Sequence, residues 1–145
     1  VQLSTFVKKA RLAVESRHVT FYVCYLSVDG RHELIEINSD GQLIHRYNHQ
    51  IELYVTWHWS DDVMEIYDYQ HLALDSVGRV LIADGRSGRF DGRVLLFDKE
   101  LNFIRVLLNY KQLDSSPPCQ LNFNNNKHEL YVGLRNSRVN VYHWK

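Results

Sequence analysis

The chain has 145 residues, of which 45% are hydrophobic, and it carries 17 basic and 17 acidic side chains. This apolar content excludes an intrinsically disordered chain, and the formal net charge of zero excludes a global attraction to nucleic acid or anionic membrane. The two cysteines, Cys24 and Cys119, lie far apart without C-x-x-C spacing, so we expect neither a disulfide framework nor a zinc site, and we predict buried free thiols in a reducing, cytoplasmic compartment.

The sequence predicts no contact with a membrane. No run of about 18 apolar residues occurs that could span a bilayer. The N-terminus also lacks the pattern of a signal peptide, and it begins at Val1 without an initiator methionine. We therefore expect a segment of a longer protein.

Short apolar runs separated by polar turns predict β-strands along most of the chain. Residues 6–17 have a spacing compatible with a helix, but the apolar pattern within them recurs later in a strand context. The following runs are rich in Val, Ile, Leu, Tyr and Phe and predict strands: 21–28, 33–37, 42–47, 79–83, 93–97, 102–108, 129–134 and 138–144. No helical rhythm separates them, which favours an all-β fold over a parallel α/β sheet.

The strands form an internal repeat. Residues 12–25, 72–84 and 121–134 share a short apolar strand, a polar turn and a stronger strand. A third strand follows each of them, and a fourth follows in the first two repeats. Repeats at about 10–48, 70–108 and 119–145 predict about three four-stranded antiparallel blades of a partial β-propeller, with the second strands at 21–25, 79–84 and 129–133. A plain β-sandwich is the alternative, although it needs no such similarity.

The residues also carry a family resemblance. The stretch "HLALDSVGRVLIAD" and the following "GRVLLFDKELNFIRVLL" resemble an NHL repeat. The first and last repeats resemble the final repeats of tripartite-motif proteins with C-terminal NHL propellers. The chain departs from the family at 49–70, which lacks the usual glycine-rich connection and proline. The resemblance implies six blades, so we expect this chain to associate with remaining propeller blades or with another copy of itself.

The resemblance implies a non-catalytic binding module. Such a module recognises a protein partner or single-stranded or structured RNA, and it recruits substrates for a RING ubiquitin ligase region that this chain does not contain. We therefore expect no enzymatic activity, no cofactor and no metal site in the chain itself. The alternative is a metal-dependent hydrolase that resembles gluconolactonase propellers, for which Glu15, Asp75 and Asn124 lie at related repeat positions.

The stretch "DGRSGRFDGRV" at 84–94 holds three glycines and three arginines. A phosphate-binding loop would lead into a helix, whereas a strand follows here, so we predict a hairpin loop. In the family, an aspartate and an arginine tie the base of this hairpin together, which implies a structural pair of Asp84 and Arg93. The last repeat has Arg138 but places Leu134 at the partner position.

Two sets of residues are candidates for partner binding. Arginines occur in all three loops between second and third strands, and they predict a binding rim for protein or RNA unless these loops are only solvated turns: Arg31, Arg86, Arg89 and Arg135. Trp57 and Trp59 alternate with His58, so both indoles share one strand face and either pack between blades or anchor a partner peptide.

Overall fold

The computed structural model describes residues 20–28, 30, 32–47, 66, 68–85 and 92–144, together with the backbone of residues 10–15. This part of the chain is all-β, as the sequence predicts, and is built from three antiparallel sheets without a helix. It accordingly holds no helix that could cross a membrane.

Each sheet is a meander in which strands that follow one another in the chain are hydrogen-bonded neighbours. Sheet 1 contains β1 (Ala10–Glu15), β2 (Thr20–Leu26), β3 (His32–Asn38) and β4 (Leu43–Arg46). Sheet 2 contains β5 (Tyr69–Leu74), β6 (Val80–Asp84), β7 (Arg93–Phe97) and β8 (Phe103–Leu108). Sheet 3 contains β9 (Pro118–Asn124), β10 (Glu129–Leu134) and β11 (Val139–His143).

The three predicted second strands coincide with β2, β6 and β10 to within one residue at each end. The helical spacing at 6–17 does not produce a helix where the backbone is described, because residues 10–15 pair with β2 as strand β1. Pairing with a neighbouring strand therefore prevails over local propensity in this segment.

The turns within the sheets are set by Asn and Asp side chains that mimic a backbone turn. Asn38 Oδ1 accepts hydrogen bonds from the N–H groups of Asp40 and Gln42 at 3.0 and 2.9 Å. Asp98 Oδ1 accepts from the N–H groups of Glu100 and Asn102 at 3.0 and 2.8 Å. These polar residues interrupt the apolar strands at the points where the chain reverses, and they fix the register of the following strand.

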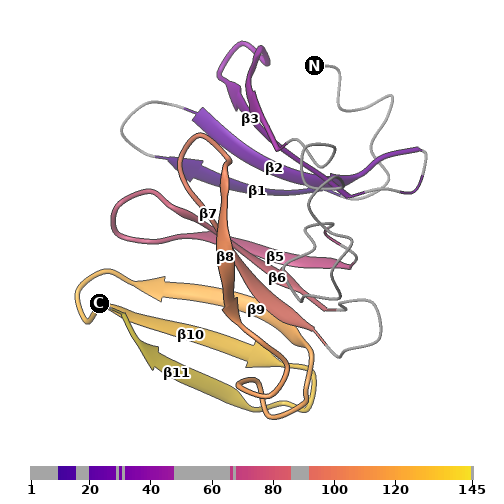
Figure 1. Ribbon diagram of the computed structural model, residues 1–145. Helices are drawn as coiled ribbons and strands as arrows, with labels where there is room; N and C mark the ends of the chain where they lie inside the picture. The colour runs from indigo at the N-terminus through magenta and orange to yellow at the C-terminus, as the bar shows by residue number, and fades with distance from the viewer. Residues whose placement is uncertain are drawn as a thin grey trace.

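The three sheets lie one after another, with sheet 2 between the other two (Figure 1). The first strands of successive sheets are neighbours, since β1 contacts β5 and β5 contacts β9. Two separate apolar clusters hold the stack together. One joins sheets 1 and 2 around Tyr22, Leu34 and Phe97, and the other joins sheets 2 and 3 around Leu96 and Leu130.

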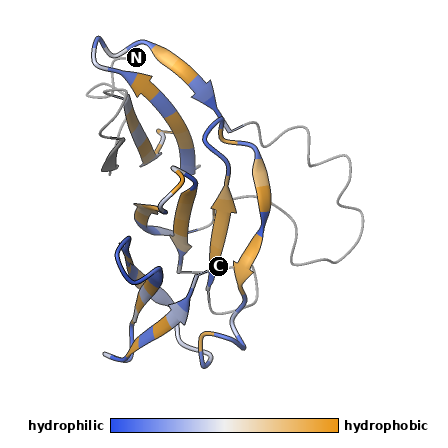
Figure 2. Cartoon of the chain, turned by 90° about the vertical axis from the view of Figure 1, so that its left-hand side faces the viewer, coloured by the Kyte–Doolittle hydropathy of each residue, from blue (hydrophilic) through white to orange (hydrophobic). Residues whose placement is uncertain are grey.

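Sheet 2 is buried on both faces, because every residue of β6 and β7 is buried. Sheet 3 is buried on one face only. The side chains of β10 alternate between buried and partly exposed positions, and hydrophobic and hydrophilic bands alternate along the strands in Figure 2. The face of sheet 3 that points away from sheet 2 presents mostly polar residues, among them Gln120, Asn122 and Glu129. Sheet 3 is therefore amphipathic in the manner of a sheet at the end of a stack.

Candidate functional site

The base of the long hairpin in sheet 2 is tied by a buried ion pair. Arg93 Nε donates to Asp84 Oδ2 at 3.2 Å, and the two side chains are 4% and 0% exposed. The other oxygen, Asp84 Oδ1, accepts the backbone N–H of Asp68 at 2.8 Å. One carboxylate therefore joins the end of β6, the start of β7 and the chain entering β5.

Two glycines allow the chain to pass closely around this pair. Gly92 has a φ of +85°, and a Cβ there would lie 2.5 Å from Pro118 Cδ and 3.0 Å from the carbonyl oxygen of Asp84. A Cβ at Gly85 would lie 2.9 Å from Asp68 Oδ2. A side chain at Gly92 would therefore collide with the start of β9, so this glycine sets how closely sheets 2 and 3 approach.

The corresponding loop of sheet 3 is held by backbone groups. Arg135 N–H donates to the carbonyl oxygen of Pro117 at 2.9 Å, and Asn136 N–H donates to Ser116 Oγ at 3.2 Å. The exposed guanidinium of Arg135 lies 3.9 Å from Asp68 Oδ2. The loop after β10 thus lies beside the chain segments that enter β5 and β9, and together they form what we call the loop rim: Asp68, Gly85, Gly92, Ser116, Pro117, Arg135 and Asn136.

The structure places one of the predicted binding residues in this rim. Arg135 is exposed there, and its charge is partly balanced by Asp68. The remaining candidates, Arg31, Arg86, Arg89, Trp57 and Trp59, lie outside the residues that the structure describes. Leu134, at the position of Asp84, is buried in the apolar cluster, and Arg138 is exposed at the edge of the sheet.

The residues considered for a metal centre have other contacts. Asp75 Oδ1 accepts the N–H groups of Val77 and Arg79 at 3.0 and 2.8 Å, and Asp75 Oδ2 accepts Arg79 Nε at 2.6 Å. Asn124 Oδ1 likewise accepts two backbone N–H groups of its turn. Only the backbone of Glu15 is described, where it belongs to β1. In the described part of the chain, no group of three His, Cys, Asp or Glu residues is placed to hold a metal ion.

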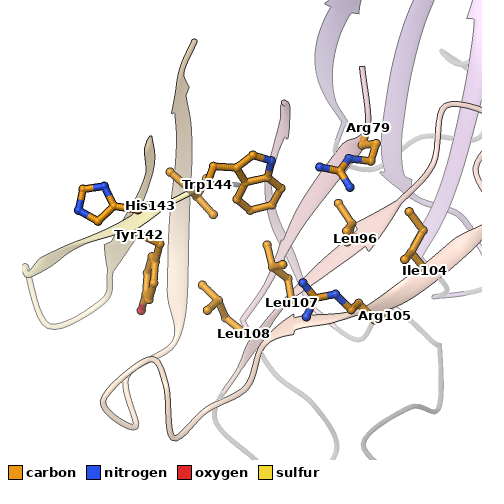
Figure 3. A pocket seen from close by; sticks show the side chains of 10 residues that line it. Arg79, Leu96, Ile104, Arg105, Leu107, Leu108, Tyr142, His143 and Trp144 are labelled. Atoms are coloured by element: carbon orange, nitrogen blue, oxygen red, sulfur yellow. The ribbon is translucent and has the colours of Figure 1, made fainter. Parts of the chain in front are cut away.

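A groove of about 370 Å³ lies between sheets 2 and 3, on the side of β8 and β11 (Figure 3). Its apolar walls are Leu96, Ile104, Leu107 and Leu108 from sheet 2 and Leu130 and Trp144 from sheet 3. The guanidinium of Arg79 lies 5.5 Å above the indole ring of Trp144, within cation–π range. The groove could not be predicted from the sequence, because its walls come from strands of two different repeats.

Two groups have shifted pKa values with physical causes. Burial, followed by the charges of Asp84 and Glu33, raises the pKa of the Cys24 thiol well above its ordinary value. The hydrogen bond that Tyr131 donates to Glu129 at 2.6 Å raises the pKa of its phenol. Cys24 is thus an inert, protonated core residue, whereas Cys119 is exposed and not buried as the sequence suggested.

Sequence comparisons with known proteins do not assign the chain to a family. The chain matches no family model, and no curated protein matches its sequence.

Proposed function

We propose that the chain forms three consecutive blades of an NHL-type β-propeller and acts as a non-catalytic binding module. The observation that carries this proposal is the order of the strands. Each sheet runs from its first to its last strand in chain order, and the first strands β1, β5 and β9 are neighbours. Blades that radiate from a common axis have this arrangement.

The buried pair in sheet 2 supports the same proposal. Asp84 and Arg93 tie the hairpin base where the resemblance to NHL repeats implies such a pair. The carboxylate also binds the segment that enters the first strand of the same sheet, through Asp68 N–H. This contact joins sheet 2 to the connection that precedes it.

We propose a protein as the partner of the loop rim. Phosphate binding draws its affinity from basic side chains that release counterions. The chain has no net charge, and Arg135, the rim arginine that the structure describes, lies near the carboxylate of Asp68. The resemblance further implies that the partner is a substrate brought to a ubiquitin ligase region of the same polypeptide.

The test combines two double variants of the candidate binding residues with two readouts. Arg86→Gln combined with Arg89→Gln, and Trp57→Ala combined with Trp59→Ala, are compared with the control Arg46→Gln, which alters an exposed arginine of sheet 1. Affinity purification from cell extract, quantified by mass spectrometry, should recover a reproducible partner with the wild type and the control, and lose it with at least one double variant.

Titration with labelled single-stranded RNA is the second readout, and we expect no binding by the wild type. RNA binding whose salt dependence flattens by roughly two units in the double arginine variant would overturn the protein assignment. Partner recovery that none of the substitutions changes would place the binding face elsewhere.

A further inference from the structure

The turn between β10 and β11 carries a serine whose hydroxyl is exposed. The backbone N–H of Ser137 donates to the carbonyl oxygen of Leu134 at 3.0 Å, while its Oγ forms no hydrogen bond with any residue that the structure describes. Because the turn joins the ends of two strands, it belongs neither to a face nor to an edge of sheet 3. The hydroxyl is therefore open to a reagent from solution.

The backbone at this position favours glycine. Ser137 has a φ of +70°, in the left-handed region that a side chain disfavours. The equivalent turn of sheet 1 has Gly30 there, with a φ of +88° and the same bond, from its N–H to the carbonyl oxygen of Ser27 at 3.0 Å. Sheet 3 thus has a hydroxyl where glycine would suit the turn better. A side chain that opposes the backbone preference points to a role for that side chain.

Two arginines flank this hydroxyl. Arg135 lies two residues before Ser137, and Arg138 directly follows it. The Arg135 side chain is 59% exposed and approaches Asp68 Oδ2 only to 3.9 Å. Arg138 is exposed and forms no salt bridge within the described part of the chain. Both guanidiniums are therefore accessible to the carboxylates with which arginine-directed serine kinases select their substrates.

The other exposed serines that the structure describes have acidic neighbours. Each of them lies directly beside an aspartate in the sequence: Ser39, Ser76 and Ser115. An aspartate at the acceptor would be repelled by the acidic pocket of an arginine-directed kinase. Among the described residues, Ser137 is thus the exposed serine that lies in a positively charged segment.

We infer that Ser137 is a phosphorylation site for an arginine-directed serine kinase. The Ser137 Oγ forms a bond to the γ-phosphorus of ATP, and the bond from that phosphorus to the β–γ bridging oxygen breaks. ADP leaves with the electrons of that bond, and the hydroxyl proton passes to the catalytic aspartate of the kinase. The turn can open locally to enter the kinase, since residues 135–138 are all exposed. The inference does not depend on the proposed function.

The phosphoryl group would change the charge of the turn. It adds nearly two negative charges between two arginines, so the turn changes from basic to nearly neutral. Guanidinium pairs with phosphate in a short, charge-assisted geometry. Arg135, which lies 3.9 Å from Asp68 Oδ2, would therefore turn toward the phosphate and leave the Asp68 carboxylate without this cation.

Incubation of the purified 145-residue chain with Mg-ATP and single kinases tests the site, with the products mapped by tandem mass spectrometry. Protein kinase A and protein kinase C select arginine, whereas casein kinase 2 selects acidic residues. We expect an arginine-directed kinase to modify Ser137 and casein kinase 2 not to do so. Arg135→Gln combined with Arg138→Gln should lower the initial rate at Ser137 at least about tenfold. The control Arg46→Gln, which alters an exposed arginine of β4, should not change this rate.

Two further samples keep the test decisive. Ser137→Gly removes the acceptor and suits the left-handed backbone, so it should fold and take up no phosphate at this position. A synthetic peptide of residues 133–141 serves as the unfolded reference. Modification of the peptide but not of the native chain would show that the fold hides Ser137, and would overturn the inference. So would modification of neither, or modification of Ser39, Ser76 or Ser115 at the same rate as Ser137.

Discussion

Sheets 2 and 3 are formed by two copies of the same sequence pattern, yet they differ in how far they are buried. Sheet 2 lies between two neighbours, and its strands β6 and β7 are buried throughout. Sheet 3 buries one face, and its edge strand exposes Val139 and Val141. Sheet 2 closes its hairpin with a buried carboxylate, whereas sheet 3 has Leu134 at that position. The two sheets thus differ in how much of their surface is buried, although their strands follow one another in the same order.

Removal of the Asp84 carboxylate from sheet 2 should lower the unfolding free energy more than any other change considered. Asp84→Ala removes the carboxylate that the buried Arg93 guanidinium and the Asp68 N–H both contact, so we expect a loss of about 3–5 kcal/mol in unfolding free energy. Arg138 of sheet 3 corresponds to Arg93 but is exposed, so Arg138→Ala should change the unfolding free energy by less than about 0.5 kcal/mol. Urea denaturation followed by circular dichroism measures both. Similar losses in the two variants would contradict the contrast between the sheets.

The contact between the two sheets can be tested at a glycine. Gly92 has a left-handed backbone, and a Cβ there would collide with Pro118. We therefore expect Gly92→Ala to lower the unfolding free energy by about 1–3 kcal/mol more than Gly78→Ala does. Gly78 is the matched control because its φ is +84° and the nearest atoms to its Cβ would be those of the Lys99 side chain, at an ordinary contact distance of 3.6 Å. Thermal unfolding of the two variants gives the difference. Equal midpoints would show that β9 does not pack against this turn.

The core between sheets 1 and 2 should respond to alkaline pH. The raised pKa of Cys24 means that the folded protein keeps a proton that the unfolded chain loses above its ordinary pKa of 9.0. The unfolding free energy should therefore be unaffected below this pH and fall above it, by at most about 1.4 kcal/mol per pH unit. Urea midpoints between about pH 8 and pH 10.5, compared with Cys24→Ala as the control, measure the decline. An identical decline of the urea midpoint in Cys24→Ala would show that the Cys24 thiol is not its cause.

Thiol labelling is the mildest test, since it changes no residue. Cys119 is exposed and should react with Ellman's reagent in the native protein, whereas Cys24 should react only after unfolding. The absorbance change should correspond to one thiol per chain before denaturant is added and to both afterwards. Rapid reaction of both thiols in the native protein would show that the core between sheets 1 and 2 is open.

The sequence predicted the strands well because their apolar runs and polar turns are local signals. It located β2, β6 and β10 and the residues of the hairpin pair, but not the contact of Asp84 with Asp68, which joins positions 16 apart. The groove at Trp144 was likewise missed, since its walls converge only when two repeats pack together. Cys119 was assigned to the core, although the register shift of β9 beside Gly133 leaves it exposed.

Hydrogen–deuterium exchange of the free monomer, resolved by NMR, tests the contrast between the sheets most directly. Ile82 and Leu95, in the middle of sheet 2, should exchange only through global unfolding. The amides of Val139, Val141 and His143 should exchange at rates near those of an unstructured peptide, because they point away from β10 and no strand in the described part of the chain pairs with them. Protection of these three amides in the absence of any partner would show that the edge of sheet 3 is already covered, and would contradict the account.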